Sequence, residues 1–179
     1  MKKLLLPISF LLTVFTGCIK NTPAINSDSK VEFDAATWNA NAAGVTYPIF
    51  SQIPVYGAVT IPAPITTPPT PPTTPLLTRT LATFQIRVNL LGTQKSTATT
   101  FNYRVVSGET TATAGVHYTP LSGTGTIPAN SSYGYIDIAL LNSGVSSTTP
   151  VILVLEILSN DIVTSNTNYA KVGFRIAQL

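Results

Sequence analysis

The sequence has few of the residue types on which most protein chemistry depends. It contains one cysteine, one histidine and one tryptophan, and only 9% of its 179 residues are charged. A single cysteine has no disulfide partner in the chain, and a single histidine excludes two-histidine zinc motifs such as HExxH. The seven acidic residues are spread thinly and supply no pair that would face across a cleft, as glycoside hydrolysis requires. These shortages favour a protein that is not an enzyme and predict no cofactor.

The basic residues give no sign of nucleic-acid binding. Ten Lys and Arg stand against seven Asp and Glu, for a formal net charge of +3. Two of the ten are Lys2 and Lys3, and without residues 1–17 the remaining eight are scattered singly, with no run or stripe that could track a phosphate backbone. No nucleic-acid partner is expected.

The residues that are abundant favour an all-β protein. The chain holds 28 Thr, 14 Pro and 11 Gly. Threonine suits a pleated, half-buried surface, whereas Pro and Gly mark turns. Segments that alternate apolar and polar residues, as strands with one buried face do, recur between these turns. Residues 151–158 are apolar on both faces apart from Glu156, as in a central strand. The alternating segments are residues 31–34, 84–90, 101–105, 136–140 and 172–176.

The first seventeen residues are typical of an export signal. Two lysines precede an apolar run over residues 4–14, which is shorter than the roughly 20 residues that a membrane-spanning helix needs. Small residues come next, as in a secretory signal peptide. We expect residues 1–17 to be removed.

The residues around Cys18 indicate a lipid anchor. Val14-Phe15-Thr16-Gly17-Cys18 resembles the lipobox of bacterial lipoproteins, with Phe15 in place of the usual Leu. The resemblance implies that Cys18 carries a diacylglycerol and an amide-linked acyl chain such as palmitate, and two or more chains give stable anchoring. It also implies attachment to the outer membrane. Lys20 without neighbouring acids leaves the periplasmic and the surface face as alternatives.

The mature chain divides into a tether and one domain. Residues 18–30 are polar and predict a lipidated flexible tether, and residues 31–179 predict a β-sandwich. Residues 39–77 form an irregular insertion in which residues 45–50 and 55–61 could pair as a hairpin. Seven prolines within residues 62–75 favour extended polyproline II. That segment is either a stiff surface loop or spacer, or else a docking segment or glycosylated stalk.

One segment resembles a known sequence motif and does more than alternate apolar and polar residues. Thr113-Ala114-Gly115-Val116-His117-Tyr118, with the glycine-rich strand and turn after it, resembles the Calx-β motif. The resemblance covers most of residues 31–179 and implies an immunoglobulin-like, two-sheet sandwich of about seven strands. Calx-β domains that bind calcium gather several carboxylates, whereas here His117 replaces an Asp and no acidic pair comes after Leu141. Only Glu109, Asp161 and Asp34 could approach a loop end, so no metal site is expected.

Four aromatic residues in or beside the insertion are the candidates for binding. Trp38, Tyr47, Phe50 and Tyr56 are expected to be exposed, and loops often carry function. We interpret Trp38, Tyr47 and Tyr56 as candidate ligand-binding residues, with a core role for Trp38 as the alternative. The sequence supports two functions. One is a non-catalytic envelope lipoprotein that serves as an interaction or assembly module for an envelope protein or glycan partner, and the other is a carbohydrate-binding accessory lipoprotein of a glycan-uptake system.

Replacing the lipidated cysteine tests the anchor. Cys18→Ser should release the protein from membranes, because serine offers no thiol for the diacylglycerol. Fractionation of cells that express each form, followed by immunoblotting, measures the effect. If the variant still sediments with membranes as the wild type does, the anchor is not at Cys18.

Overall fold

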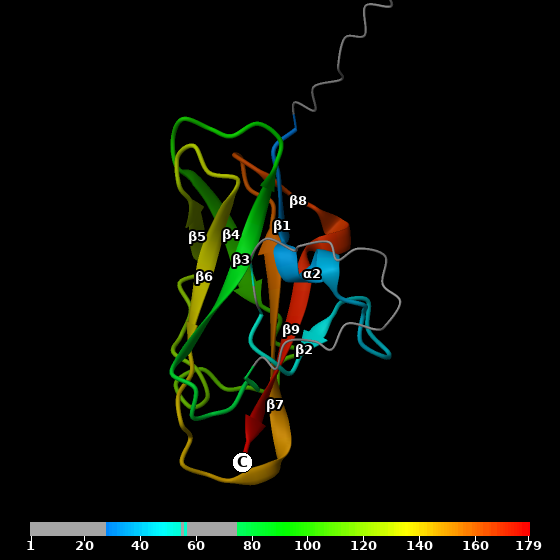
Figure 1. Ribbon diagram of the computed structural model, residues 1–179, viewed down its shortest axis with the longest axis vertical. Helices are drawn as coiled ribbons and strands as arrows, with labels where there is room; N and C mark the ends of the chain where they lie inside the picture. The colour runs from blue at the N-terminus through cyan, green and yellow to red at the C-terminus, as the bar shows by residue number, and fades with distance from the viewer. Residues whose placement is uncertain (1–27, 55, 57–74) are drawn as a thin grey trace, which may run out of the picture.

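The computed structural model describes residues 28–54, 56 and 75–179, apart from the side chains of Thr37 and Trp38. Two mixed β-sheets pack face to face, and they form the expected Calx-β-like, immunoglobulin-like sandwich (Figure 1). The expected signal peptide, most of the tether and the proline-rich part of the insertion lie outside the described residues.

Each sheet combines strands that are distant in the sequence. The four-stranded sheet has the order β6-β3-β1-β8 and the five-stranded sheet the order β2-β9-β7-β4-β5. The sequence predicted about seven strands, and the described residues form nine, two of which, β2 and β8, contain only two residues each. The elements are β1 (Lys30–Phe33), α2 (Asp34–Trp38), β2 (Ile49–Phe50), β3 (Thr83–Leu91), β4 (Thr99–Val105), β5 (Thr124–Ile127), β6 (Tyr133–Ala139), β7 (Ser147–Leu158), β8 (Thr164–Ser165), η1 (Thr167–Tyr169) and β9 (Lys171–Gln178).

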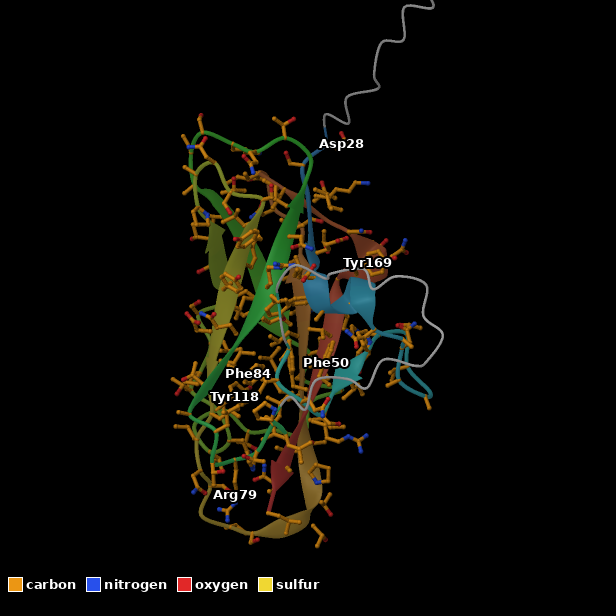
Figure 2. The ribbon with its side chains drawn as sticks, viewed as in Figure 1. Asp28, Phe50, Arg79, Phe84, Tyr118 and Tyr169 are labelled. Carbon is orange, nitrogen blue, oxygen red and sulfur yellow. The ribbon has the colours of Figure 1, made fainter. Side chains whose placement is uncertain are left out.

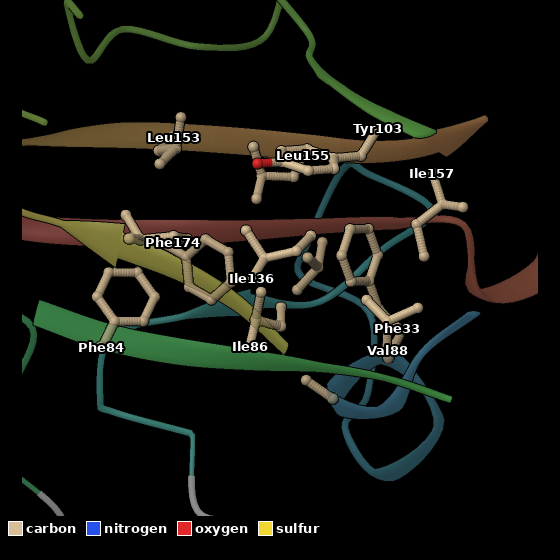
Figure 3. Packing of buried hydrophobic residues seen from close by; sticks show 14 of the residues in the cluster. Phe33, Phe84, Ile86, Val88, Tyr103, Ile136, Leu153, Leu155, Ile157 and Phe174 are labelled. Carbon is tan, nitrogen blue, oxygen red and sulfur yellow. The ribbon is translucent and has the colours of Figure 1, made fainter. Parts of the chain in front are cut away.

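The alternating segments bury the side chains that the sequence predicted. In β3, Phe84, Ile86 and Val88 point into the space between the sheets, where Phe84 meets Phe174 of β9 at a ring-centroid distance of 5.0 Å (Figure 3). Burying each of these side chains contributes roughly 1.5–3 kcal/mol. The apolar layer between the sheets therefore stabilises the sandwich without a disulfide.

Strand β7 is central, as its apolar sequence predicted. It lies between β9 and β4, and Val154 is fully buried although it points to the opposite face from Leu153 and Leu155. Its one charged residue, Glu156, pairs with Arg104 of the neighbouring strand at 2.6 Å. Because the adjacent strand supplies a cation, the carboxylate is tolerated at the edge of the core.

The insertion adds an edge to the five-stranded sheet. Its strand β2 runs parallel to β9, with Ile49 opposite Gly173. The Ile53 amide donates to the Pro75 carbonyl at 3.0 Å, and the Leu77 amide donates to the Ser51 carbonyl at 2.9 Å. Residues 51–53 and 75–77 of the insertion thus lie side by side. The second segment of the hairpin expected between residues 45–50 and 55–61 lies outside the described residues apart from Tyr56, so the hairpin stays a prediction.

The predicted exposure of Tyr47 was wrong. The sequence suggested an exposed ring, but Tyr47 is only 5% exposed. Lys171 lies over its ring at 5.3 Å from the centroid and also pairs with Glu109 at 2.8 Å. The side chain therefore joins the insertion to the sandwich, since the neighbouring charges of β9 and the turn after β4 cover it. Burial raises the pKa of Tyr47 to about 12, with the hydrogen bond to Glu109 adding to the effect.

Gly134 lies where strands of the two sheets come close together. It lies in β6, where a Cβ atom would overlap the carbonyl oxygen of Thr126 in β5. Backbone atoms on that strand cannot move aside as a flexible side chain would. Glycine at this position therefore lets the edge strands of the two sheets come together.

A methyl group at position 134 should weaken the fold. Gly134→Ala is expected to lower the free energy of unfolding by about 1–3 kcal/mol, because overpacking forces the strands apart. Urea denaturation followed by circular dichroism measures the change. Gly108→Ala is the matched control, since a Cβ there has no atom within 4 Å. Equal stability of both variants would show that the sheet edges are not in close contact.

The Glu109 contact predicts a dependence on pH. A hydrogen bond from Lys171, then one from Tyr47, lowers the pKa of Glu109 below its usual value of 4.5. A carboxyl with a lowered pKa adds stability above its unfolded-state pKa, and that stability is lost as the pH falls through the folded-state pKa. The loss of stability on acidification from about pH 6 to about pH 3 should therefore be smaller in Glu109→Gln than in the wild type.

Urea titrations at both pH values measure this difference. Asp161→Asn is the control, because Asp161 is also an exposed acid but lacks the pairing with Lys171. The same acid sensitivity in Glu109→Gln and in the wild type would contradict the assignment.

Candidate functional site

A group of aromatic side chains lies on the outer face of the four-stranded sheet. The register of β3 and β6 sets Arg87 opposite Tyr135 and Asn89 opposite Tyr133. Since Ile86 and Val88 point into the core, their neighbours in β3 point outward. Tyr133 and Tyr135 are 44% and 38% exposed, and their rings meet edge to face at 5.7 Å. We call the set Tyr56, Arg87, Tyr133 and Tyr135 the aromatic face.

Arg87 holds the aromatic face together. Its guanidinium carbon lies 5.1 Å from the ring centroid of Tyr56 and 5.2 Å from that of Tyr133. A guanidinium over a tyrosine ring is attracted by about 0.5–1 kcal/mol, and by more where water is excluded. Tyr56 also meets Tyr135 at 6.2 Å. Each ring in the group therefore contacts at least one other member.

Asp34 fixes the orientation of Arg87. One of its oxygens accepts from Arg87 Nε at 3.0 Å and from a terminal guanidinium nitrogen at 2.7 Å, and the other accepts from Asn89 Nδ2 at 2.6 Å. The alternation over residues 31–34 implies a strand position for Asp34 with its side chain outward. Instead, β1 ends at Phe33 and Asp34 begins α2, where it is only 4% exposed. The prediction was wrong because the chain changes from strand to helix at this residue, which turns the carboxylate toward Arg87 and Asn89.

Among the described residues, Glu32, the second buried carboxylate of this region, is held by amide side chains and not by an arginine. It points outward from β1, as predicted, but is only 5% exposed, and its carboxylate accepts from Asn166 Nδ2 at 2.7 Å. Burial raises its pKa, hydrogen bonds from Asn166 and Asn89 oppose that shift, and Asp34 adds to it. Both carboxylates are thus engaged by neighbouring donors. What the face presents to solvent is ring surface and hydrogen-bonding groups, with the charge of Arg87 matched by Asp34.

The structure brings only one of the predicted binding residues to this site. Tyr56 is half-buried on the aromatic face, and burial of its ring raises the pKa of its hydroxyl. Tyr47 lies elsewhere, against Lys171 of β9. The side chain of Trp38 and all of Cys18 are outside the described residues, so their roles stay predictions.

Sequence reasoning missed Tyr133, Tyr135 and Arg87, although a signal was present. Ile136 and Ile138 were predicted to point inward, which places Tyr133 and Tyr135 on the opposite, outward face of the same strand. Likewise, Arg87 alternates with buried residues in β3. The missing information was the pairing of β3 with β6, which brings the three side chains together.

The acids and the histidine give no sign of a metal centre. In the described part of the chain, no three His, Cys, Asp or Glu side chains are grouped to hold a metal ion. Nδ1 of His117 accepts a hydrogen bond from the Thr113 amide at 2.9 Å. This contact gives the histidine a role in the turn around Gly115, whose φ of 79° suits glycine. No helix among the described residues has the length and apolar character to cross a membrane.

Solved structures share the architecture. The apo form of the Calx CBD1 domain is similar with a TM-score of 0.52 and 12% identity, over 84% of this chain and 96% of that one. The CBD12 structure from CALX1.2 has a TM-score of 0.45 and 18% identity over 55% of this chain, and the match spans 40% of that longer chain. A proposed carbohydrate binding protein from Bacteroides ovatus ATCC 8483 has a TM-score of 0.42 and 14% identity, over 57% of this chain and 33% of that one. At such identities the likeness to CBD1 shows the fold alone.

Comparison of sequences identifies the family. No curated protein matches the chain. A family model described as a domain of unknown function, DUF4843, matches residues 78–175, more than half of the chain. The matched region contains β3 and β6, and with them Arg87, Tyr133 and Tyr135. The chain belongs to the DUF4843 family.

Proposed function

We propose that this protein is a non-catalytic binding module of the cell envelope and that the aromatic face is its binding surface. The observation that carries the proposal is the pair of exposed rings, Tyr133 and Tyr135, which meet on the outer face of β6. Tyrosine and arginine are the side chains that most often dominate binding energy at protein interfaces, together with tryptophan. A partner protein of the envelope is the first candidate for the ligand.

The rigidity of the face supports this role. Tyr133 and Tyr135 belong to a strand of seven residues that pairs along its whole length with β3. Arg87 packs against Tyr133 and is held by Asp34. Side chains that are already ordered lose little conformational freedom on binding, so more of the contact energy appears as affinity.

The location in the envelope rests on the amino-terminal sequence. Lipid on Cys18 would hold the module to the outer membrane, on either the periplasmic or the surface face. Eleven residues lie between Cys18 and the start of β1 at Lys30, and an extended tether of that length reaches about 40 Å. The described chain enters the sandwich at Asp28, at the end opposite the carboxyl terminus (Figure 2). The aromatic face lies on the side of the sandwich, where a tether of this kind leaves it accessible.

Carbohydrate binding is the second candidate function. Exposed aromatic rings on a sheet favour it, because the apolar face of a sugar ring packs on an aromatic ring and its hydroxyls need neighbouring polar groups. Asp137 and Gln85 supply such groups beside Tyr135, with Gln85 Nε2 donating to Asp137 Oδ1 at 2.7 Å. In this case the protein would be an accessory lipoprotein of a glycan-uptake system.

Removing the two rings tests the binding surface. The double variant Tyr133→Ala, Tyr135→Ala should bind its partner roughly thirtyfold more weakly, because hot-spot side chains contribute about 2 kcal/mol or more. Crosslinking of the anchored protein in intact cells and a subsequent pull-down measure a protein partner, and a glycan array measures a sugar ligand. Tyr169→Ala is the matched control, since Tyr169 is 36% exposed on η1, away from the aromatic face.

The two candidate functions give different outcomes in this experiment. A protein captured by the wild type and by Tyr169→Ala but lost in the double variant supports the interaction module. A glycan signal with the same pattern supports the carbohydrate-binding function. Unchanged binding of every ligand by the double variant would show that the aromatic face is not the binding surface.

A further inference from the structure

A groove opens where one segment passes from the four-stranded sheet to the five-stranded sheet. The Thr119 amide donates to the Ala139 carbonyl at 2.9 Å, so this segment first runs along β6. Four residues later, the Gly123 carbonyl accepts from Tyr103 of β4 at 2.9 Å, and the chain continues as β5. Figure 1 shows β5 and β6 at the same side of the sandwich. Between the departing segment and the middle of β6 lies a cavity of about 290 Å³.

The strand edge along this groove has unpaired backbone groups. In an antiparallel pair, alternate residues turn both their N–H and C=O groups toward the partner strand. The Leu140 amide donates to the Ala82 carbonyl, and the Ser132 carbonyl accepts from the Leu90 amide. The main-chain N–H and C=O groups of the even-numbered residues of β6 therefore point toward β3. The amides and carbonyls of Tyr135 and Asp137 therefore face the groove. Within the described part of the chain, no hydrogen bond reaches these four groups.

The open stretch is too short for an added β-strand. At one end, Thr119 already pairs with Ala139, and at the other end, Thr126 of β5 lies against Gly134. Only residues 135–137 remain open, which corresponds to about 7 Å of strand. Strand addition by a partner protein uses a longer run of main-chain hydrogen bonds. A compact ligand with several hydroxyl groups fits this window better than an extended peptide.

The groove walls are polar and contain one aromatic rim. Tyr135 and Asp137 contribute exposed side chains at its edge, and hydroxyl groups line the opposite wall. Gln85 holds one oxygen of Asp137, and none of the described groups donates to the other. The groove therefore offers a ring face, a positioned carboxylate oxygen and main-chain donors and acceptors. The hydroxyls belong to Thr119, Ser122 and Thr124.

We infer that this groove binds one sugar unit of a neutral glycan, an inference that rests on the proposed function as a binding module. A sugar hydroxyl both donates and accepts, as the main-chain groups of Tyr135 and Asp137 require. An acidic sugar is disfavoured, because the carboxylate of Asp137 would repel it and Asp34 already matches the charge of Arg87. The adjacent ring of Tyr135 packs on the apolar face of the same sugar or of the next one.

Two substitutions in the groove test the inference. The probes are an array of neutral oligosaccharides of glucose, galactose, mannose and N-acetylglucosamine, and a matched set with uronic acids. The wild type should bind a subset of the neutral probes and none of the acidic ones. Asp137→Asn should weaken that binding about tenfold, because the neutral amide oxygen accepts a weaker hydrogen bond than the carboxylate does. Thr119→Tyr, which fills the groove from an exposed position, should abolish it.

The control and the failure outcomes separate this inference from the proposed function. Asp161→Asn removes an exposed acid elsewhere and should bind as the wild type does. If no neutral oligosaccharide binds, or if both groove variants bind them unchanged, the groove is not a sugar site. Loss of binding in the Tyr133→Ala, Tyr135→Ala variant but not in the groove variants would overturn this inference and leave the proposed function standing. Binding of a synthetic extended peptide to the groove, weakened by the Thr119→Tyr substitution, would overturn the inference in favour of strand addition.

Discussion

The ion pair between Arg87 and Asp34 connects four parts of the molecule that are distant in the sequence. It links the first turn of α2 to the middle of β3, and it holds the guanidinium between the rings of Tyr56 and Tyr133. Asp34 is nearly buried and the side chain of Arg87 is 21% exposed. Removing one partner of a buried pair leaves a charge without compensation, which costs several kcal/mol. The arrangement of the aromatic face thus depends on this contact.

A second constraint is the closeness of the two sheet edges at β5 and β6. Gly134 allows backbone atoms to meet there, and the chain changes sheets just before that point. The change leaves Tyr135 and Asp137 with main-chain groups that the fold does not use. The exposed ring of Tyr135 belongs to the aromatic face and to the rim of the groove. The two candidate binding surfaces are therefore continuous, and one extended ligand could contact both.

The sequence predicted the core more fully than the site. Alternation placed Phe84, Ile86 and Val88 inward, and the structure confirms them, because every second side chain of a strand meets the opposite sheet. It failed for Tyr47, whose burial depends on Lys171 in the last strand. The turn around Gly115 was predicted from its motif, since local backbone geometry requires glycine there.

By itself, the sequence determined the all-β class, the two-sheet sandwich and the positions that face the core, because these depend on a period of two residues and on turn chemistry. It also predicts the lipid anchor at Cys18, which the folded domain leaves untested. Tertiary structure alone decided that Tyr56, Tyr133 and Tyr135 gather around Arg87, and that β6 keeps an open edge. Those features depend on the pairing of β3 with β6, in which Thr83 lies opposite Ala139, 56 residues further along the chain, and no local pattern specifies which strands become neighbours.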